Sequence, residues 1–211
     1  MQTAVLTFTL AAALIVLLPG PDTLVVLRSL LRDGRRRAAL TVLGVLTGLA
    51  VWVAAAALGL SALLRASHDG YTALRIAGAG YLLWLGVQSL RARSGLAPGQ
   101  PALPPRGGGR RLGLLGTGFG AGLATDLLNP KVGVFFITFL PGFVPHGHPV
   151  GATSLLLGMV FIVETALYFA LLLLLAGRAT SWFGNPRVRR RLDRATGLVL
   201  IGFGVRLGVE S

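Results

Sequence analysis

The sequence contains no cysteine, a single lysine and few charged residues overall. Without cysteine, the chain has no disulfide framework, no thiolate metal site and no membrane dithiol electron carrier. Charged residues make up 13% of the 211 positions, against about 25% in a typical soluble domain. Hydrophobic residues make up 54%, and the mean hydropathy is +0.74. This composition indicates a membrane protein rather than a cytosolic one.

Basic residues outnumber acidic ones by 20 to 7, which gives a net charge of +13. A nucleic-acid-binding surface would show a basic stripe with interleaved aromatic residues, whereas these arginines fall between hydrophobic runs. We therefore expect no nucleic-acid partner. The arginines are interpreted as signals of membrane topology and as contacts to the anionic lipids of the bilayer.

Signatures of a metal site or of an enzyme are scarce. The three histidines, His68, His146 and His148, fall in predicted loops. His146 and His148 are close enough in sequence to touch one metal ion, but a solvated loop is the favoured interpretation. The chain has no phosphate-binding P-loop, no nucleophile elbow and no HExxH helix. We expect no metal, no cofactor and no enzyme activity.

Long apolar runs dominate the chain, and a membrane-spanning helix needs roughly 20 such residues. The runs cover about residues 3–27, 38–64, 71–90, 112–140, 150–176 and 194–209. The first is not predicted to be a secretory signal, because it lacks a positive n-region and a small-residue cleavage site. The sequence therefore predicts an all-α integral membrane protein with six transmembrane helices.

The arginines predict how these helices are oriented. Sixteen of the 20 basic residues lie in the connections after the first, third and fifth runs, whereas the loop at residues 141–150 has none. Cytoplasmic loops carry the excess of basic residues, so these three connections are predicted to be cytoplasmic. Both termini are then predicted to lie outside, in the periplasm.

A stretch rich in proline and glycine divides the chain into two halves. Residues 94–110 cannot bury enough apolar surface to order themselves and are predicted to form a flexible cytoplasmic linker. They separate a first unit, residues 1–93, from a second unit, residues 111–211, with three spans each. Because three is odd, we expect two inverted three-helix repeats.

Proline interrupts the first span. Pro19 and Pro21 lack an N–H group, so the carbonyls of Ile15 and Leu17 are predicted to lose their partners within the helix. Gly20 between them further weakens the helix. Unpaired backbone in a membrane is tolerated only where it lines a cavity or is paired by neighbours. The break therefore predicts a polar site inside the bundle.

The fourth span contains a matching break. Pro130 is predicted to free the carbonyl of Asp126, four residues earlier. When the halves are overlaid, Pro21 meets Pro130 and Asp22 meets Lys131. Because these last two residues have opposite charge, we expect them to face each other across the bundle. Paired broken helices in inverted halves are typical of a transporter's midplane site.

Ionisable residues in predicted spans are expensive to place there and are functional candidates. They are Asp22, Asp126, Lys131 and Glu164. The alternative is a structural role, as internal salt bridges and caps or, for Glu164, as a neutral hydrogen-bonded carboxyl group in the fifth span. Glycines at spacings of four, at 44–48, 116–120, 118–122 and 204–208, predict close helix interfaces.

Four stretches together resemble the LysE/RhtB superfamily of amino-acid exporters. They are LLPGPDTLVVL, GAGYLLWLGVQSLRA, NPKVGVFFITFLPGFV and GLVLIGFGVRLGV, and they follow the order seen in the family. The resemblance implies a bacterial inner-membrane protein that exports amino acids or their derivatives, including homoserine and its lactone, driven by the proton gradient. The family often has Asn after the first Pro-Gly-Pro, where this chain has Asp22, and the added carboxylate would favour a cationic group.

An amino acid is a zwitterion, so its carboxylate needs a cation and its ammonium group needs a carboxylate or unpaired carbonyls. Lys131 is expected to bind the substrate's carboxylate. Asp22 or Asp126, with the carbonyls at the breaks, is expected to bind its ammonium group. Glu164 is the candidate for proton coupling. The predicted substrate site comprises Gly20, Pro21, Asp22, Asp126, Asn129, Pro130 and Lys131.

Three other interpretations stay open at this point. A membrane scaffold or assembly factor would keep the spans but tolerate loss of Lys131 and Asp22. An exporter of another small ion would use the same architecture, and an intramembrane enzyme would use Asp22 and Asp126 as an acid–base dyad. The sequence also leaves the oligomeric state open, a homo-oligomer included.

Overall fold

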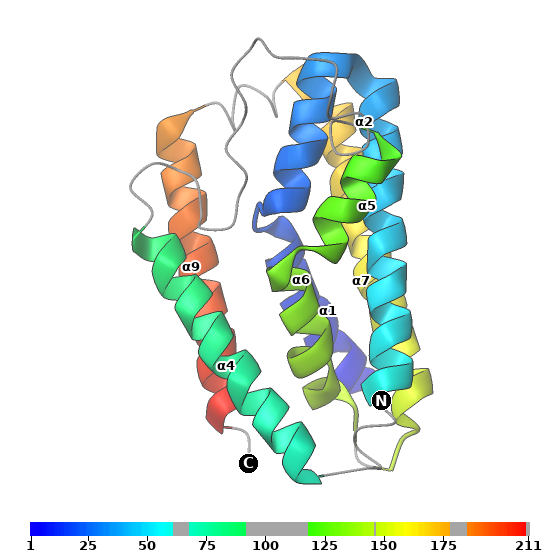
Figure 1. Cartoon of the computed structure of the whole chain (residues 1–211), viewed down its shortest axis with the longest axis vertical. Coiled ribbons are helices and arrows are strands. Elements are labelled where there is room, and N and C mark those ends of the chain that lie inside the picture. The colour runs from blue at the N-terminus through cyan, green and yellow to red at the C-terminus, as the bar shows by residue number, and fades with distance from the viewer. Residues whose placement is uncertain (61–67, 92–117, 146, 178–184, 210–211) are drawn as a thin grey trace.

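The computed structural model describes residues 1–60, 68–91, 118–145, 147–177 and 185–209, and the regular elements in these ranges are all helical (Figure 1). The all-α prediction is thus confirmed. The main helices are α1 (Gln2–Leu17), α2 (Pro21–Ala55), α4 (His68–Arg91), α5 (Phe119–Leu127), α6 (Pro130–Val134), α7 (Val150–Leu174) and α9 (Pro186–Val209). Short elements follow α2 and α6, namely η1 (Ala56–Leu60), η2 (Phe135–Phe139) and η3 (Leu140–Phe143).

The helix boundaries test where the sequence predicts loops and breaks. His68 begins α4, so its placement in a loop was wrong, whereas His148 lies in the predicted loop. The linker at residues 94–110 and His146 lie outside the described residues. Both proline breaks fall where the sequence places them, before Pro21 and before Pro130.

Two helices are long and apolar enough to cross a membrane, Pro21–Gly59 and Val150–Leu174. A third crossing is added if the bent pair Phe119–Leu127 and Pro130–Phe143 counts as one span, with 51° between its parts. The described residues therefore form an all-helical membrane protein with two or three such spans by length and composition. Helix α1 is apolar but shorter, and α4 and α9 are less apolar.

The long α2 is not one straight rod. Gly34 has φ 79° and ψ −178°, which lie outside the helical range and favour glycine. Figure 1 shows the chain rising to this point, turning over and descending again. The turn separates an apolar part that follows the first break from a second apolar part. This division matches the predicted boundary between the first and second runs.

One end of the bundle gathers the arginine-rich segments. The turn near Gly34, with Arg32 and Arg35–Arg37 around it, lies at the upper end in Figure 1, toward which α9 starts and α4 finishes. The start of α1 and the end of α9 lie at the opposite end. The ends of the described chain thus share one side of the bundle, and the turn of α2 lies on the other.

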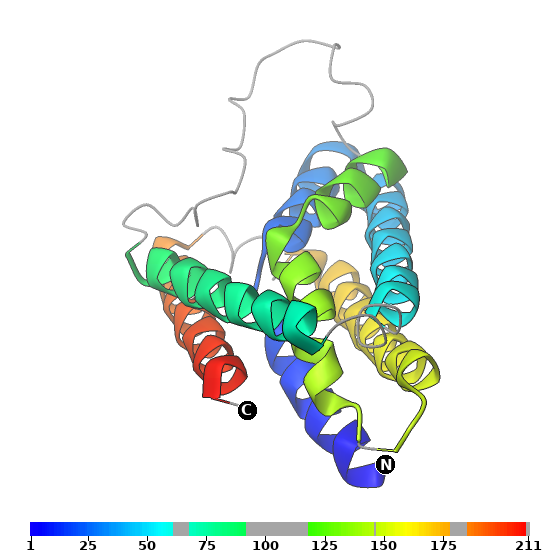
Figure 2. The same cartoon turned by 60° about the horizontal axis from the view of Figure 1, so that its bottom comes forward.

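Glycines allow helix backbones to touch at two seams, which both views show as side-by-side helices (Figures 1 and 2). Between α2 and α5, a Cβ on Gly44 would collide with the Phe119 carbonyl, and one on Gly122 with the Thr41 carbonyl. Between α4 and α9, Gly86 and Gly197 each lie against the other's carbonyl oxygen. The predicted close interface is confirmed at both glycines of 44–48, at Gly122 of 118–122 and at Gly204 of 204–208. Gly118 and Gly208 make only ordinary contacts, and 116–120 begins outside the described residues.

Aromatic packing fixes the helices that carry the breaks. Phe8 of α1 contacts Phe135 and Phe143, with ring centroids 5.9 and 5.3 Å apart. Phe161 of α7 lies 5.0 Å from Phe135 and 5.2 Å from Phe136. These rings are buried, and they hold α1 and α7 against the segment that follows the second break. The two breaks are thereby held in a fixed relation.

The α2–α5 seam gives a test of close backbone packing. We expect Gly122→Ala to lower the free energy of unfolding by about 1–3 kcal/mol, because the added methyl group has no room beside the Thr41 carbonyl. Gly80→Ala is the matched control, since a Cβ there meets nothing within 4 Å. Thermal unfolding in detergent measures both variants, and equal melting temperatures for the two would contradict the close packing.

Candidate functional site

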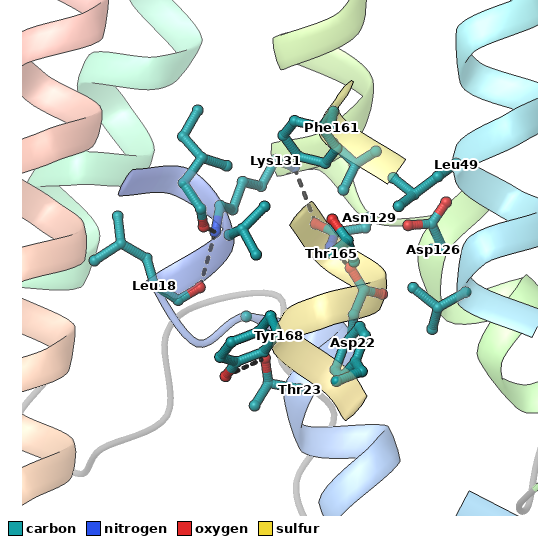
Figure 3. Close-up of a pocket in the computed structure, with 16 residues that line it drawn as sticks. Leu18, Asp22, Thr23, Leu49, Asp126, Asn129, Lys131, Phe161, Thr165 and Tyr168 are labelled. Atoms are coloured by element: carbon teal, nitrogen blue, oxygen red, sulfur yellow. Dashed lines mark hydrogen bonds between the residues drawn. The ribbon is translucent and has the colours of Figure 1, made fainter. Parts of the chain in front are cut away.

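The two breaks lie beside each other and enclose a small cavity (Figure 3). At the first, α1 ends at Leu17 and the backbone is extended at Leu18 and Gly20 before α2 begins. At the second, α5 ends at Leu127, and Asn129 is extended before α6 begins. Segments more than 100 residues apart in sequence thus meet at one point, as the overlay of the halves predicts.

The cavity is lined by five of the seven predicted substrate-site residues, Gly20, Asp22, Asp126, Asn129 and Lys131. The other two, Pro21 and Pro130, begin the helices that follow the breaks. Glu164 is not among the lining residues. The cavity volume of about 40 Å³ is room for a few water molecules, since one water needs about 10–15 Å³ on this measure.

Lys131 reaches from the second break to the first. Its Nζ donates to the carbonyl oxygens of Ile15, at 2.8 Å, and Leu18, at 3.0 Å (Figure 3). The ammonium group lies beside Gly20, where a Cβ would be 3.9 Å from Nζ. The Ile15 carbonyl, which Pro19 cannot serve as a donor, accepts instead from the backbone N–H of Leu18 at 3.3 Å and from this lysine of the other half of the chain.

Asn129 connects the second break to Asp22. Its Nδ2 donates to Asp22 Oδ2 at 2.7 Å, and its Oδ1 accepts the backbone N–H of Lys131 at 3.1 Å as the cap of α6. Asp22 Oδ1 is buried and has no hydrogen-bond partner among the described residues. The amide side chain thus satisfies one carboxylate oxygen and one helix terminus at once.

Asp22 and Lys131 face the same cavity from the two breaks, as expected, but among the described residues they do not form a direct ion pair. Lys131 instead donates to backbone carbonyls, and Asp22 accepts from Asn129. The sequence overlay thus identified two groups of one site, but their hydrogen-bond partners are other groups of that site.

Asp126 is the most enclosed acidic residue of the cavity, with 0% of its surface exposed. Neither carboxyl oxygen has a hydrogen-bond partner among the described residues. The group packs on Gly48, where a Cβ would come 2.5 Å from Oδ2. Its backbone carbonyl, predicted to be free, accepts from Asn129 N at 3.0 Å and from Trp52 Nε1 at 3.3 Å. That prediction is therefore wrong, because neighbours supply new donors.

Helix α7 adds polar groups that the sequence analysis missed. Thr165 and Tyr168 line the cavity, and the Tyr168 hydroxyl lies 3.4 Å from that of Thr23. Together with Phe161 they follow helical spacing along one face, which is the signal that could have found them. Glu164 lies on the same helix, and both its carboxyl oxygens are buried without a partner in the described part of the chain.

The arrangement combines one ammonium group, buried carboxyl groups and backbone carbonyls turned away from regular helix bonding. Such a set is suited to a small bipolar molecule, and it lies inside a helical membrane protein. The chain also matches the LysE type translocator family over residues 13–211. The protein belongs to this family.

Relatives of this translocator extend over nearly its whole length. It is 30% identical to the Bacillus subtilis membrane protein YrhP, with 94% of this chain and 95% of that one covered. It is 30% identical to a homoserine/homoserine lactone efflux protein of Salmonella typhi, with 95% and 93% covered. It is 31% identical to the threonine efflux protein of Escherichia coli K12, with 90% and 89% covered. No solved structure gives a significant match.

The Asn129 bridge of the translocator can be tested against a natural counterpart. Asn185 caps α9 in the same way, with Oδ1 accepting from Arg187 N at 2.9 Å, but it is exposed and no buried carboxylate is bonded to it in the described structure. Removing the capping side chain at either position should lower the free energy of unfolding by about 1 kcal/mol. We expect Asn129→Ala to lower the free energy of unfolding by ~1–3 kcal/mol more than Asn185→Ala does, because Asp22 also loses its hydrogen-bond donor.

Thermal unfolding of both purified variants in detergent measures the difference. Asn129→Asp serves as a second variant, since it keeps a capping oxygen but places a second carboxyl group beside Asp22, and it should be at least as unstable as Asn129→Ala. Equal losses for Asn129→Ala and Asn185→Ala would show that the bond to Asp22 contributes nothing.

Proposed function

We propose that this translocator exports amino acids or their derivatives, of the neutral amino acid, homoserine or homoserine lactone type, across the bacterial inner membrane. The proton gradient drives export, and the protein is a carrier and not an enzyme. The observation that carries the proposal is the meeting of the two breaks, which brings an ammonium group, carbonyls and carboxyl groups to one cavity. The efflux names of its relatives support the same substrate class.

The cavity offers complementary groups for both ends of a zwitterion. Lys131 provides the cation for a substrate carboxylate. The acceptors for an ammonium group are the carbonyls at the end of α1 and, beside them, Asp22, which has one buried oxygen without a partner among described residues. A space of about 40 Å³ holds water but not an amino acid. Substrate entry therefore requires side chains of the cavity to move, as expected for a carrier that occludes its site between two open states.

We propose six spans for the architecture, arranged as inverted units of residues 1–93 and 111–211 with the linker at 94–110 in the cytoplasm. The order of the helices and the break at the start of each unit support this arrangement. The turn of α2 and the ends of the described chain lie at opposite sides of the bundle (Figure 1). We propose that both termini lie in the periplasm, because the arginine-rich turn at the other side of the bundle favours the cytoplasm.

Reporter enzymes fused along the chain test this orientation. Fusions after residue 147 should be active as periplasmic reporters, and fusions near residues 34, 104 and 188 as cytoplasmic ones, because the arginine-rich connections stay inside. A cytoplasmic C-terminus would remove the sixth span and the inverted arrangement.

Export is measured as uptake of labelled amino acids into inverted membrane vesicles. We expect gradient-dependent uptake of neutral amino acids or homoserine by the unaltered protein. Lys131→Ala and Asp22→Asn should reduce uptake to the level of vesicles lacking the protein, because each removes one of the charges that hold the substrate. Gly80→Ala, distant from other atoms, should transport normally. Uptake of no amino acid at all would favour a scaffold or an exporter of another small ion.

The same vesicles test the proposed coupling role of Glu164. If this carboxyl group relays protons, Glu164→Gln should abolish gradient-driven uptake while exchange of labelled for unlabelled substrate persists. Driven uptake that survives the substitution would assign Glu164 a structural role.

A further inference from the structure

The carbonyls of Ile15 and Leu18 form a site already occupied by a cation. They come from the last turn and the extended end of α1, where aligned peptide dipoles concentrate negative charge. Two oxygens at 2.8 and 3.0 Å from one nitrogen accept hydrogen bonds from two of the three N–H donors of an ammonium group. The site is complete without any side chain of the first break, since the residue beside it is Gly20.

The occupant is the chain's single lysine. All other basic residues are arginine, and a guanidinium group is a planar fork suited to carboxylates, whereas an ammonium group is a compact point charge. A lysine Nζ on these carbonyls has the same chemistry as the amino group of an amino acid. The resemblance of its ammonium group to that of an amino acid thus explains why position 131 is a lysine and not an arginine.

We propose that the carbonyl pair of Ile15 and Leu18 is the binding site for the substrate's ammonium group, and that Lys131 fills it in the substrate-free state. This inference rests on the proposed function. On binding, the substrate's ammonium group replaces that of Lys131, and the displaced lysine pairs with the substrate's carboxylate. No covalent bond is made or broken in the exchange, and the net charge of the cavity is unchanged because the zwitterion adds one positive and one negative charge.

The exchange defines a substrate class. A zwitterion supplies both an ammonium group for the carbonyls and an anion for the displaced lysine. An amine without a carboxylate would add a second cation to the cavity and bring no anion for the displaced Lys131, which is unfavourable inside the membrane. The unaltered protein should therefore bind an amino acid better than the corresponding amine, and removal of the lysine should reverse this order for small amines.

The first experiment removes the occupant and offers a substitute. Lys131→Ala lacks three carbons and the ammonium group, which n-propylammonium replaces. At several times its dissociation constant, n-propylammonium should raise the melting temperature of Lys131→Ala in detergent by roughly 2–4 °C, the shift for about a fivefold change in the folding equilibrium of a chain this size. The unaltered protein and Lys131→Met, whose side chain refills the space, should not respond.

Two controls test whether stabilisation by n-propylammonium depends on its positive charge and on the cavity at position 131. Neutral 1-propanol has the same length and should not stabilise Lys131→Ala; equal stabilisation by the alcohol would overturn the ammonium site. Arg35→Ala removes another cation bonded to helix-end carbonyls, from Arg35 Nη2 to Leu173 O at 2.7 Å, but at an exposed place. It should not respond to n-propylammonium, and a response equal to that of Lys131→Ala would likewise overturn the proposal.

The second experiment observes the displacement in the unaltered protein, and it keeps the proposal testable if Lys131→Ala does not fold. Selective ¹⁵N labelling of lysine gives a single Nζ signal, because the chain has one lysine. A transported amino acid should shift this signal, and its decarboxylated amine at the same concentration should not. An unchanged signal at saturating amino acid, with transport intact, would overturn the inference and leave the proposed function standing. Rescue by n-propylammonium without any amino-acid transport would overturn the proposed function, and the carbonyl pair would then remain an ammonium site without a role in amino-acid binding.

Discussion

Everything around the cavity depends on one constraint, which is that backbone groups inside a membrane need partners. A regular helix meets this need by itself, but two breaks in one bundle do not. Here each break is completed by the other half of the chain. Lys131 of the second break donates to the end of α1, and Asn129 joins the cap of α6 to the carboxylate that follows the first break.

Because each break takes its hydrogen-bond partners from the other half of the chain, the helices around the breaks have to lie close together, and glycines allow this. Gly48 allows the carboxyl group of Asp126 to lie directly against α2, and Gly133 gives room to the ring of Trp52, whose Nε1 bonds to the Asp126 carbonyl. Larger residues at either glycine would push the helices around the second break away from the second part of α2. Packing and the polar chemistry of the cavity are thus parts of the same arrangement.

Much of this could be predicted from the sequence, for identifiable reasons. Proline has no N–H, so the positions of the breaks and the lost helical partner of the Ile15 carbonyl follow from local chemistry. Residue spacing likewise located the glycine seams. The partners of Lys131 and Asp22 could not be predicted, because opposite charges suggest a pair while the fold places nearer donors and acceptors beside each. The role of Thr165 and Tyr168 depends on which face α7 turns inward, and their polarity alone does not reveal it.

The α2–α5 seam limits which parts of the molecule can rearrange. Where backbone meets backbone at Gly44 and Gly122, sliding by even one residue would bring a side chain into space that holds only a hydrogen atom. These two helices are therefore joined as a single rigid body. The non-helical residues of the two breaks, 18–20 and 128–129, are where the chain between rigid helices can bend, and the bonds from Lys131 to the end of α1 oppose such bending.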